Sequence, residues 1–204
     1  MSRSAAALLI FAASAGIMIV EITAARLLAP ALGTTVHVWA AVIAFVLLGL
    51  AIGNWFGGRQ AAALTRATAR LSRAFFLAAI GTLASWILIA SLPPLTVRPW
   101  SLAVPVLALP FAIPAMATGM VKPIATALAL NHAQSRSGRI IGAMYAANAA
   151  GAVLGTFLSG FVFAAFLGLS ETMIGTAGIF LLCAAILSVA RTAARLPSEE
   201  GETP

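Results

Sequence analysis

The chain has 204 residues, of which 62% are hydrophobic and only 8% charged, and its formal net charge is +7. A soluble fold of this length could not hide so much apolar surface, and the chain has no basic soluble domain that could bind a nucleic acid. The sequence therefore predicts an all-α integral membrane protein, a polytopic helical bundle in which positive loops flank apolar spans.

Six segments are long and apolar enough to cross a bilayer core of about 30 Å, which needs roughly 20 helical residues. The first is expected to begin at Ala5 and to end at Leu28, before Pro30 and Gly33. The later spans are expected at about residues 37–56, 74–92, 100–130, 139–167 and 174–190. Four prolines in the fourth span leave open whether that span is continuous, broken or re-entrant.

Arginine placement indicates the orientation of the spans. Arginines follow the second, fourth and sixth spans, whereas the opposite loops carry one charged residue or none; the arginines are Arg59, Arg66, Arg70, Arg73, Arg136, Arg139, Arg191 and Arg195. The positive-inside rule then places both termini in the cytoplasm. We expect the protein to lie in the plasma (inner) membrane. We expect residues 1–192 to form one transmembrane domain and residues 193–204 a short cytoplasmic tail. Residues 60–73 predict either an amphipathic helix at the interface or a basic loop.

Two rows of small residues indicate close helix packing. The second span has glycines at four-residue intervals, and the fifth span repeats the pattern; the glycines are Gly49, Gly53 and Gly57, then Gly151 and Gly155. Such rows let two helix backbones approach closely in a bilayer. We expect the second and fifth spans to pack together, or the row of the fifth span to form a dimer interface.

Glu21 is the most informative residue of the first span. A charge at this depth costs a few kcal/mol, so an acidic residue here is expected to face a cavity or a partner and to bind a ligand or carry a proton. Arg26 lies five positions later, about 140° around the helix, which is a poor geometry for a same-face pair. A structural ion pair, or a snorkelling Arg26, is the alternative interpretation.

Four further polar residues are candidates for the same site. His37 begins the second span and fits either an interfacial position or an outward-facing site. Lys122 fits a snorkelling position at the cytoplasmic end, or the central cavity if the fourth span is broken. Tyr145 and Asn148 share a face of the fifth span, where each needs a partner in a structural hydrogen bond or in a substrate. Asn54 is assigned to a structural turn.

The acidic residues limit the chemistry that is possible. The chain has no aspartate, and only Glu21 and Glu171 precede the acidic tail of Glu199, Glu200 and Glu202. Paired carboxylates, carboxylate metal sites and an Asp-supported triad therefore lack their parts. The single cysteine, Cys183, makes no intrachain disulfide. We expect no enzyme activity, no metal and no cofactor.

Several short motifs of the first two spans resemble the membrane portion of the fused major-facilitator/spermidine-synthase-like proteins. They are Ser14-Ala-Gly16, Arg26-Leu-Leu-Ala-Pro30 and Gly53-Asn-Trp-Phe-Gly57-Gly-Arg59, with Glu21 between the first two. Gly138-Arg139 through Tyr145 and Asn148 to Gly155 is similar to the fifth-helix pattern of that family, and Pro114, Gly119 and Pro123 are similar to its fourth. The sequence departs from the related patterns at two points. The motif at Gly53–Arg59 lacks the aspartate that is usual there in the major-facilitator superfamily, and Lys122 stands before Pro123 where an apolar residue is expected.

The resemblance implies a six-helix unit similar to half of a major-facilitator transporter. It also implies that fused relatives carry a soluble aminopropyltransferase-like domain after the helices. This sequence ends at Pro204 and contains no Gly-rich nucleotide loop after a strand. We therefore expect no aminopropyltransferase activity.

The leading functional hypothesis is a small-molecule transporter or permease that works as a homodimer, because six helices form one wall of a twelve-helix pathway. Glu21 and Arg26 would form the central polar pair, and the route would be lined by His37, Lys122, Tyr145 and Asn148. The sign of the substrate's charge is left open. The alternative is a non-transporting membrane subunit that anchors or feeds a separately encoded soluble enzyme through its basic loops.

Overall fold

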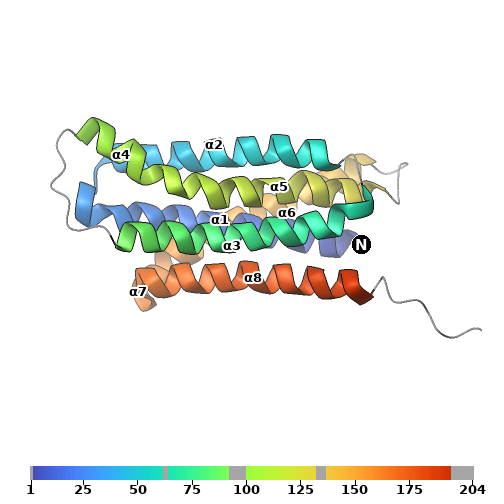
Figure 1. Cartoon of the computed structure of the whole chain (residues 1–204). Helices are drawn as coiled ribbons and strands as arrows, with labels where there is room; N and C mark the ends of the chain where they lie inside the picture. The colour runs from blue at the N-terminus through green and yellow to red at the C-terminus, as the bar shows by residue number, and fades with distance from the viewer. Residues whose placement is uncertain (1, 62–63, 92–99, 132–136, 194–204) are drawn as a thin grey trace, which may run out of the picture.

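The computed structural model describes residues 2–61, 64–91, 100–131 and 137–193 (Figure 1). Within these ranges the chain is helical without strands, and six helical segments are long and apolar enough to cross a membrane, which confirms the predicted bundle. The elements are α1 (Arg3–Leu32), α2 (Val36–Ala61), the 3-10 turn η1 (Leu64–Arg66), α3 (Ala67–Ala90), α4 (Trp100–Ala108), the 3-10 turn η2 (Leu109–Phe111), α5 (Ala112–Leu130), α6 (Ser137–Phe157), the π-helix η4 (Leu158–Phe163), α7 (Ala164–Phe166) and α8 (Leu169–Ala193).

The first helix is longer than the sequence predicts. It continues through Pro30 to Leu32 and is capped by Gly33, whose φ of 78° is a conformation that favours glycine. Pro30 is tolerated in the last turn because it removes only one backbone hydrogen bond near the end of the helix. Residues 67–73, predicted as an interfacial helix or a loop, are instead the first two turns of α3.

The fourth span is one continuous path with a single irregular turn. α4 passes through η2 into α5, and together they supply the apolar segment of residues 103–130. Pro114 has no N–H for the carbonyl of Pro110 four residues earlier. Ser85 of α3 supplies a substitute, because its Oγ lies 2.9 Å from that carbonyl and 2.7 Å from the carbonyl of Gly81 in its own helix. A hydroxyl from a neighbouring helix thus compensates for the proline.

The two glycine rows pack against different partners from the ones predicted. Gly49, Gly53 and Gly57 of α2 lie against the backbone of α5 at Ala112, Met116 and Met120. In α6, Gly151 and Gly155 lie against Phe11 and Ala15 of α1. The expectation that α2 and α6 pack on each other is therefore wrong, and α1 already covers this row, which rules it out as a dimer interface. A row of small residues indicates a close neighbour but does not say which helix it is.

The opposite side of the bundle is held by large side chains. α3 packs against α8, and Ser72 Oγ donates a hydrogen bond of 2.8 Å to the carbonyl of Ala184. The rings of Phe75 and Phe180 have centroids 6.2 Å apart and are fully buried. Phe180 also lies directly on Gly16 of α1, which lacks a Cβ where the ring packs. Aromatic rings fill the space here that glycine backbones close on the other side.

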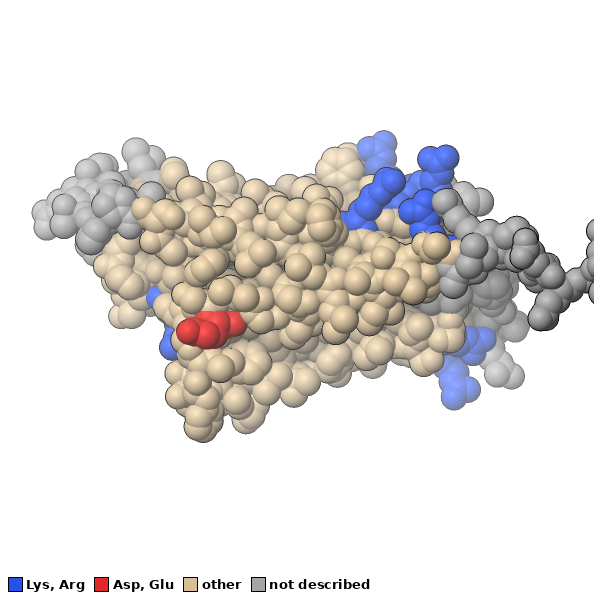
Figure 2. Space-filling view, turned by 60° about the horizontal axis from the view of Figure 1, so that its bottom comes forward, with Lys and Arg blue, Asp and Glu red and all other residues tan. Residues whose placement is uncertain are grey.

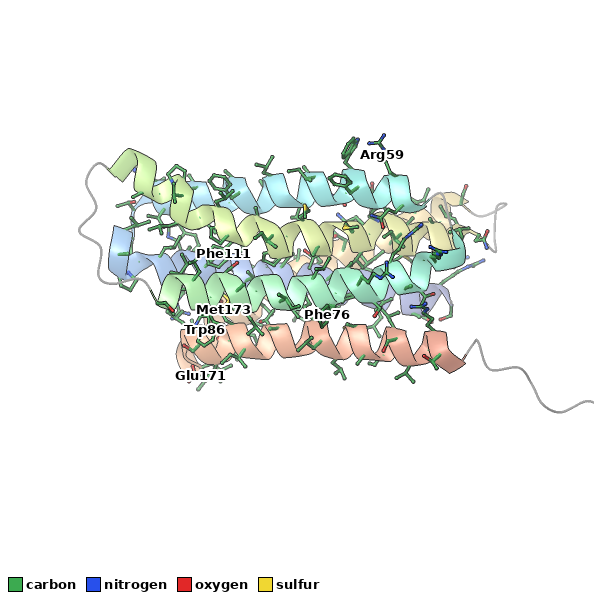
Figure 3. All side chains as sticks on the ribbon, in the orientation of Figure 1. Arg59, Phe76, Trp86, Phe111, Glu171 and Met173 are labelled. Carbon is green, nitrogen blue, oxygen red and sulfur yellow. The ribbon has the colours of Figure 1, made fainter. Side chains whose placement is uncertain are left out.

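Charge is distributed unevenly along the bundle. The N-terminus and the end of α8 lie at the same end of the molecule, together with the passage from α2 to α3 (Figure 1). Most of the basic side chains on the face shown gather at this arginine-rich end, whereas the acidic patch visible there lies toward the other (Figure 2). Arg59 sits at the first end and Glu171 at the second (Figure 3). Of the predicted basic residues, Arg136 and Arg195 lie outside the described residues, as does the acidic tail.

Candidate functional site

A small cavity lies inside the bundle between α1, α2, α5 and α6. Its volume is about 140 Å³. α3 and α8 contribute nothing to its lining. The cavity is lined by Ile10, Ala13, Ser14, Ile17, Met18, Leu50, Asn54, Thr118, Gly119, Lys122, Asn148 and Ala152. Seven of these twelve residues are aliphatic, methionine or glycine, so the few polar groups decide what the cavity can bind.

The four walls are brought together by the glycine rows and by one hydrogen bond. Gly53 and Gly119 approach each other across α2 and α5, which places Asn54 and Lys122 at the same cavity. Across α1 and α6, Ser14 Oγ donates to the backbone carbonyl of Asn148 at 2.8 Å. The side-chain amide of Asn148 makes no hydrogen bond to another described residue and remains available at the cavity.

Lys122 is the charged member of the lining. It is half-buried on α5 and has no hydrogen bond or ion pair with any described residue. The next residue, Pro123, has no N–H to give to the carbonyl of Gly119, four residues back, and Gly119 also lines the cavity. The α5 wall therefore combines an ammonium group with a backbone acceptor that lacks its helical donor. Polar backbone at membrane depth is tolerated where it lines a cavity.

The neutral polar groups of the cavity differ in whether they already have hydrogen-bond partners within the protein. Thr118 is buried, and its Oγ1 lies 2.9 Å from the carbonyl of Pro114 and 3.0 Å from that of Ala115. Asn54 is half-buried and, within the described part of the chain, its amide has no partner. Two amide side chains and one ammonium group are thus the free side-chain hydrogen-bonding groups of the cavity. Together they offer seven N–H donors, four from the amides and three from the ammonium group, and two carbonyl acceptors.

Glu21 lies just outside this lining. It follows Ile17 and Met18 by one turn on the same face of α1, toward the end of the bundle away from the arginines. Its Oε2 is buried without a hydrogen-bond partner among the described residues. No ion pair joins Glu21 to Arg26, so the structural pair considered from the sequence is not formed in this structure. A buried carboxyl oxygen without a hydrogen-bond partner is energetically costly.

The other candidates lie away from the cavity. Arg26 is half-buried near the end of α1, and His37 is exposed in the first turn of α2. Tyr145 is 64% exposed, so its side chain faces away from the bundle although Asn148 lines the cavity. Of the six predicted site residues, the structure brings Lys122 and Asn148 together and leaves the other four outside the lining.

Three polar residues of the lining were missed. Ser14 and Thr118 are not among the predicted site residues, and Asn54, predicted in a structural turn, lies within α2 at the cavity. A signal for two of them exists in the sequence. Ser14 lies seven residues before Glu21, and Thr118 lies four residues before Lys122, spacings that place each pair on one helix face.

Within the described ranges, no three residues of the types His, Cys, Asp and Glu lie together in a way that could hold a metal ion. The polar chemistry of the site therefore rests on the amide, hydroxyl and ammonium groups named above. A comparison with protein-family models finds no match for this chain, and comparisons with curated proteins and with solved structures find none either.

Proposed function

We propose that this chain is a small-molecule transporter or permease whose substrate carries a negative charge. The observation that carries the proposal is Lys122, an ammonium group at a cavity between four membrane helices, with no carboxylate partner among the described residues. A charge within an apolar span is expensive and is commonly part of a substrate or ion pathway. Its natural partner is an anion that enters the cavity.

The lining supports a substrate with one anionic group and further hydrogen-bonding groups. The amides of Asn54 and Asn148 each offer donors and an acceptor, and the remaining walls are mainly aliphatic. An organic acid, or a phosphate ester with a small polar body, fits this set better than a polyamine, because the lining contains no carboxylate. The sequence alone left this sign open, and the position of Lys122 favours the anion.

We further propose that two chains form the complete pathway, as the similarity to half of a major-facilitator transporter implies. A cavity of about 140 Å³ is smaller than the roughly 300–1,000 Å³ typical of small-ligand pockets. Two such units facing each other would supply a site of ordinary size. The span of residues 137–166 supports this arrangement. Only 17% of its apolar segment is buried within one chain, so most of its surface is available to a second chain.

Glu21 is proposed as the coupling residue. It lies one turn from the cavity on the face of α1 that lines it, and its Oε2 has no described partner. A carboxyl group in this position can carry a proton toward or away from a bound anion. The pair Glu21 and Lys122 would then replace the pair Glu21 and Arg26 that the sequence favoured.

The test is uptake by the purified full chain in liposomes. Radiolabelled lactate, succinate and inorganic phosphate serve as anionic probes, and spermidine serves as the cationic one. We expect transport of at least one anion, and a loss of about 10–100-fold in Lys122→Met, the size of a lost charge-assisted hydrogen bond. Lys122→Arg should retain part of the activity. Glu21→Gln should remove the dependence of uptake on a pH gradient.

Arg139→Gln is the matched control, because Arg139 is exposed at the arginine-rich end and does not line the cavity. Unchanged uptake in Lys122→Met would reject the role of Lys122, and transport of spermidine alone would reject the anionic substrate. A chain that moves no probe but captures a soluble enzyme at its arginine-rich end would favour the non-transporting subunit instead.

A further inference from the structure

A second and larger hollow lies at the arginine-rich end of the bundle, where α1, α3 and α8 meet. Its volume is about 940 Å³. One part of its surface is basic and the other is apolar. The basic part consists of Arg66, Arg70, Arg73 and Arg191, and the apolar part consists of Ala5, Leu8, Leu9, Ala12, Ala69, Cys183, Ile186, Leu187 and Ala190, with Thr68 beside them. We call this hollow the arginine groove.

The arginines of the groove differ in their partners. The guanidinium of Arg70 donates to the backbone carbonyl of Gln60 and so belongs to the wall. Arg66 and Arg73 are exposed and Arg191 is half-buried, and no described carboxylate forms an ion pair with any of them. The two described carboxylates lie toward the other end: Glu171 is in the first turn of α8 (Figure 3), and Glu21 is in the second half of α1, away from the N-terminus. Three cations therefore converge on one groove without a described counter-ion.

The dimensions of the groove match the boundary of a bilayer. From Arg191 to Cys183 the lining extends over eight residue steps of α8, about 12 Å along the helix at 1.5 Å per residue. The polar headgroup region of a leaflet is only about 5–8 Å thick. The groove therefore extends from the headgroup level into the hydrocarbon. Leu8 and Ile186, which are 66% and 58% exposed, supply apolar wall to it.

We propose that the arginine groove binds an anionic glycerophospholipid, with the phosphate on Arg66, Arg73 and Arg191 and the acyl chains along Leu8 and Ile186. Guanidinium groups bind phosphate oxygens in a bidentate manner, and basic pockets between membrane helices suit anionic headgroups. An apolar wall next to the cations distinguishes a lipid from a free phosphate, which would leave that wall unused. This site is separate from the central cavity, and its occupant is not the transported substrate.

The test measures lipid retention by the purified full chain. Detergent-solubilised protein is incubated with equal amounts of dioleoyl phosphatidylglycerol and dioleoyl phosphatidylcholine, and the retained lipids are counted by native mass spectrometry. We expect phosphatidylglycerol to be retained preferentially. The preference should fall by on the order of a hundredfold in the variant Arg66→Gln/Arg73→Gln/Arg191→Gln, since each surface arginine contributes to attraction of anionic lipid.

The control variant Arg3→Gln/Arg59→Gln/Arg139→Gln removes the same charge from the same end of the bundle without touching the groove. It should keep the preference. A second matched pair changes one side chain each: Ala190→Glu places a carboxylate in the groove and should abolish the preference, whereas Val189→Glu, whose residue is 67% exposed outside the groove, should not.

Several results would overturn the proposal. Equal losses in the two triple variants would mean diffuse attraction by net charge, and equal retention of the two lipids would mean that the groove does not select. Displacement of the lipid by millimolar glycerol 3-phosphate would mean a phosphate site without a lipid. A preference that arises only after Glu199→Gln/Glu200→Gln/Glu202→Gln would identify the acidic tail as the occupant.

Discussion

The two sides of the bundle close by different means. Around the central cavity, α2 lies on α5 and α1 lies on α6 through glycines, so backbones meet directly. Between α3 and α8, the space is filled by aromatic rings such as Phe75 and Phe180. The first side leaves a cavity of about 140 Å³ in the interior, and the second leaves the arginine groove, of about 940 Å³, at its end.

The difference indicates how depth limits charge. The cavity has a single ammonium group among amides and aliphatic side chains, because each charge far from water is costly. The groove carries four guanidinium groups, because long arginine side chains at helix ends reach the interface. Binding in the cavity thus depends on one positioned cation, whereas binding in the groove depends on several. Substitutions should therefore have sharper effects in the cavity and on the glycine seams that hold it.

The largest effect is expected from Gly57→Leu. A Cβ at this position would lie 2.7 Å from the Cα of Met120, so the leucine forces the backbones of α2 and α5 apart. We expect the variant to lose its monodisperse peak in size-exclusion chromatography. The loss of stability should exceed the roughly 1–3 kcal/mol of ordinary overpacking, because backbone cannot repack as a side chain does. Gly58→Leu is the adjacent control, with nothing within 4 Å of the added Cβ. Equal chromatographic profiles of the two variants would contradict the close packing of α2 on α5 at Gly57.

A smaller effect is expected on the aromatic side from Phe180→Ala. The buried ring lies on Gly16 and beside Phe75, so its removal opens a hole between α1 and α8. We expect the free energy of unfolding, measured by titration with sodium dodecyl sulfate, to fall by up to about 3–5 kcal/mol. Phe76→Ala, whose residue is 49% exposed, should change it much less. If both variants unfold alike, the packing of Phe180 does not hold this side together.

The smallest effect is expected from Ser85→Ala. The hydroxyl lies 2.9 Å from the carbonyl of Pro110, which lacks its usual helical donor four residues later because Pro114 has no N–H. Its loss should lower the free energy of unfolding by about 1 kcal/mol, seen as a lower midpoint in thermal unfolding in detergent. Ser188→Ala, at an exposed serine that bonds within its own helix, should leave the midpoint unchanged. A larger drop in the control than in Ser85→Ala would contradict this assignment.

The sequence by itself determined the class of the molecule and the number of its spans. Hydrocarbon-length apolar segments can satisfy their backbone only as helices in a membrane, so hydropathy predicts them without knowledge of their neighbours. Composition also predicted that helices would approach at the glycine rows, because close approach depends on the size of the residue itself. Which residues could be functional was visible in part, since Lys122 and Asn148 are rare polar groups in apolar spans.

Only the tertiary structure decided which helices meet and which polar residues share a cavity. The glycines of α2 pack against α5 rather than α6. Tyr145 is exposed, whereas Asn148, three residues later, lines the cavity. Ser14, Asn54 and Thr118 joined the cavity although each alone is an ordinary helix residue. The physical reason is that an apolar span has little difference in solvation around its circumference. Its rotation and its partners are therefore fixed by side-chain and backbone packing between helices, which lie far apart in the sequence.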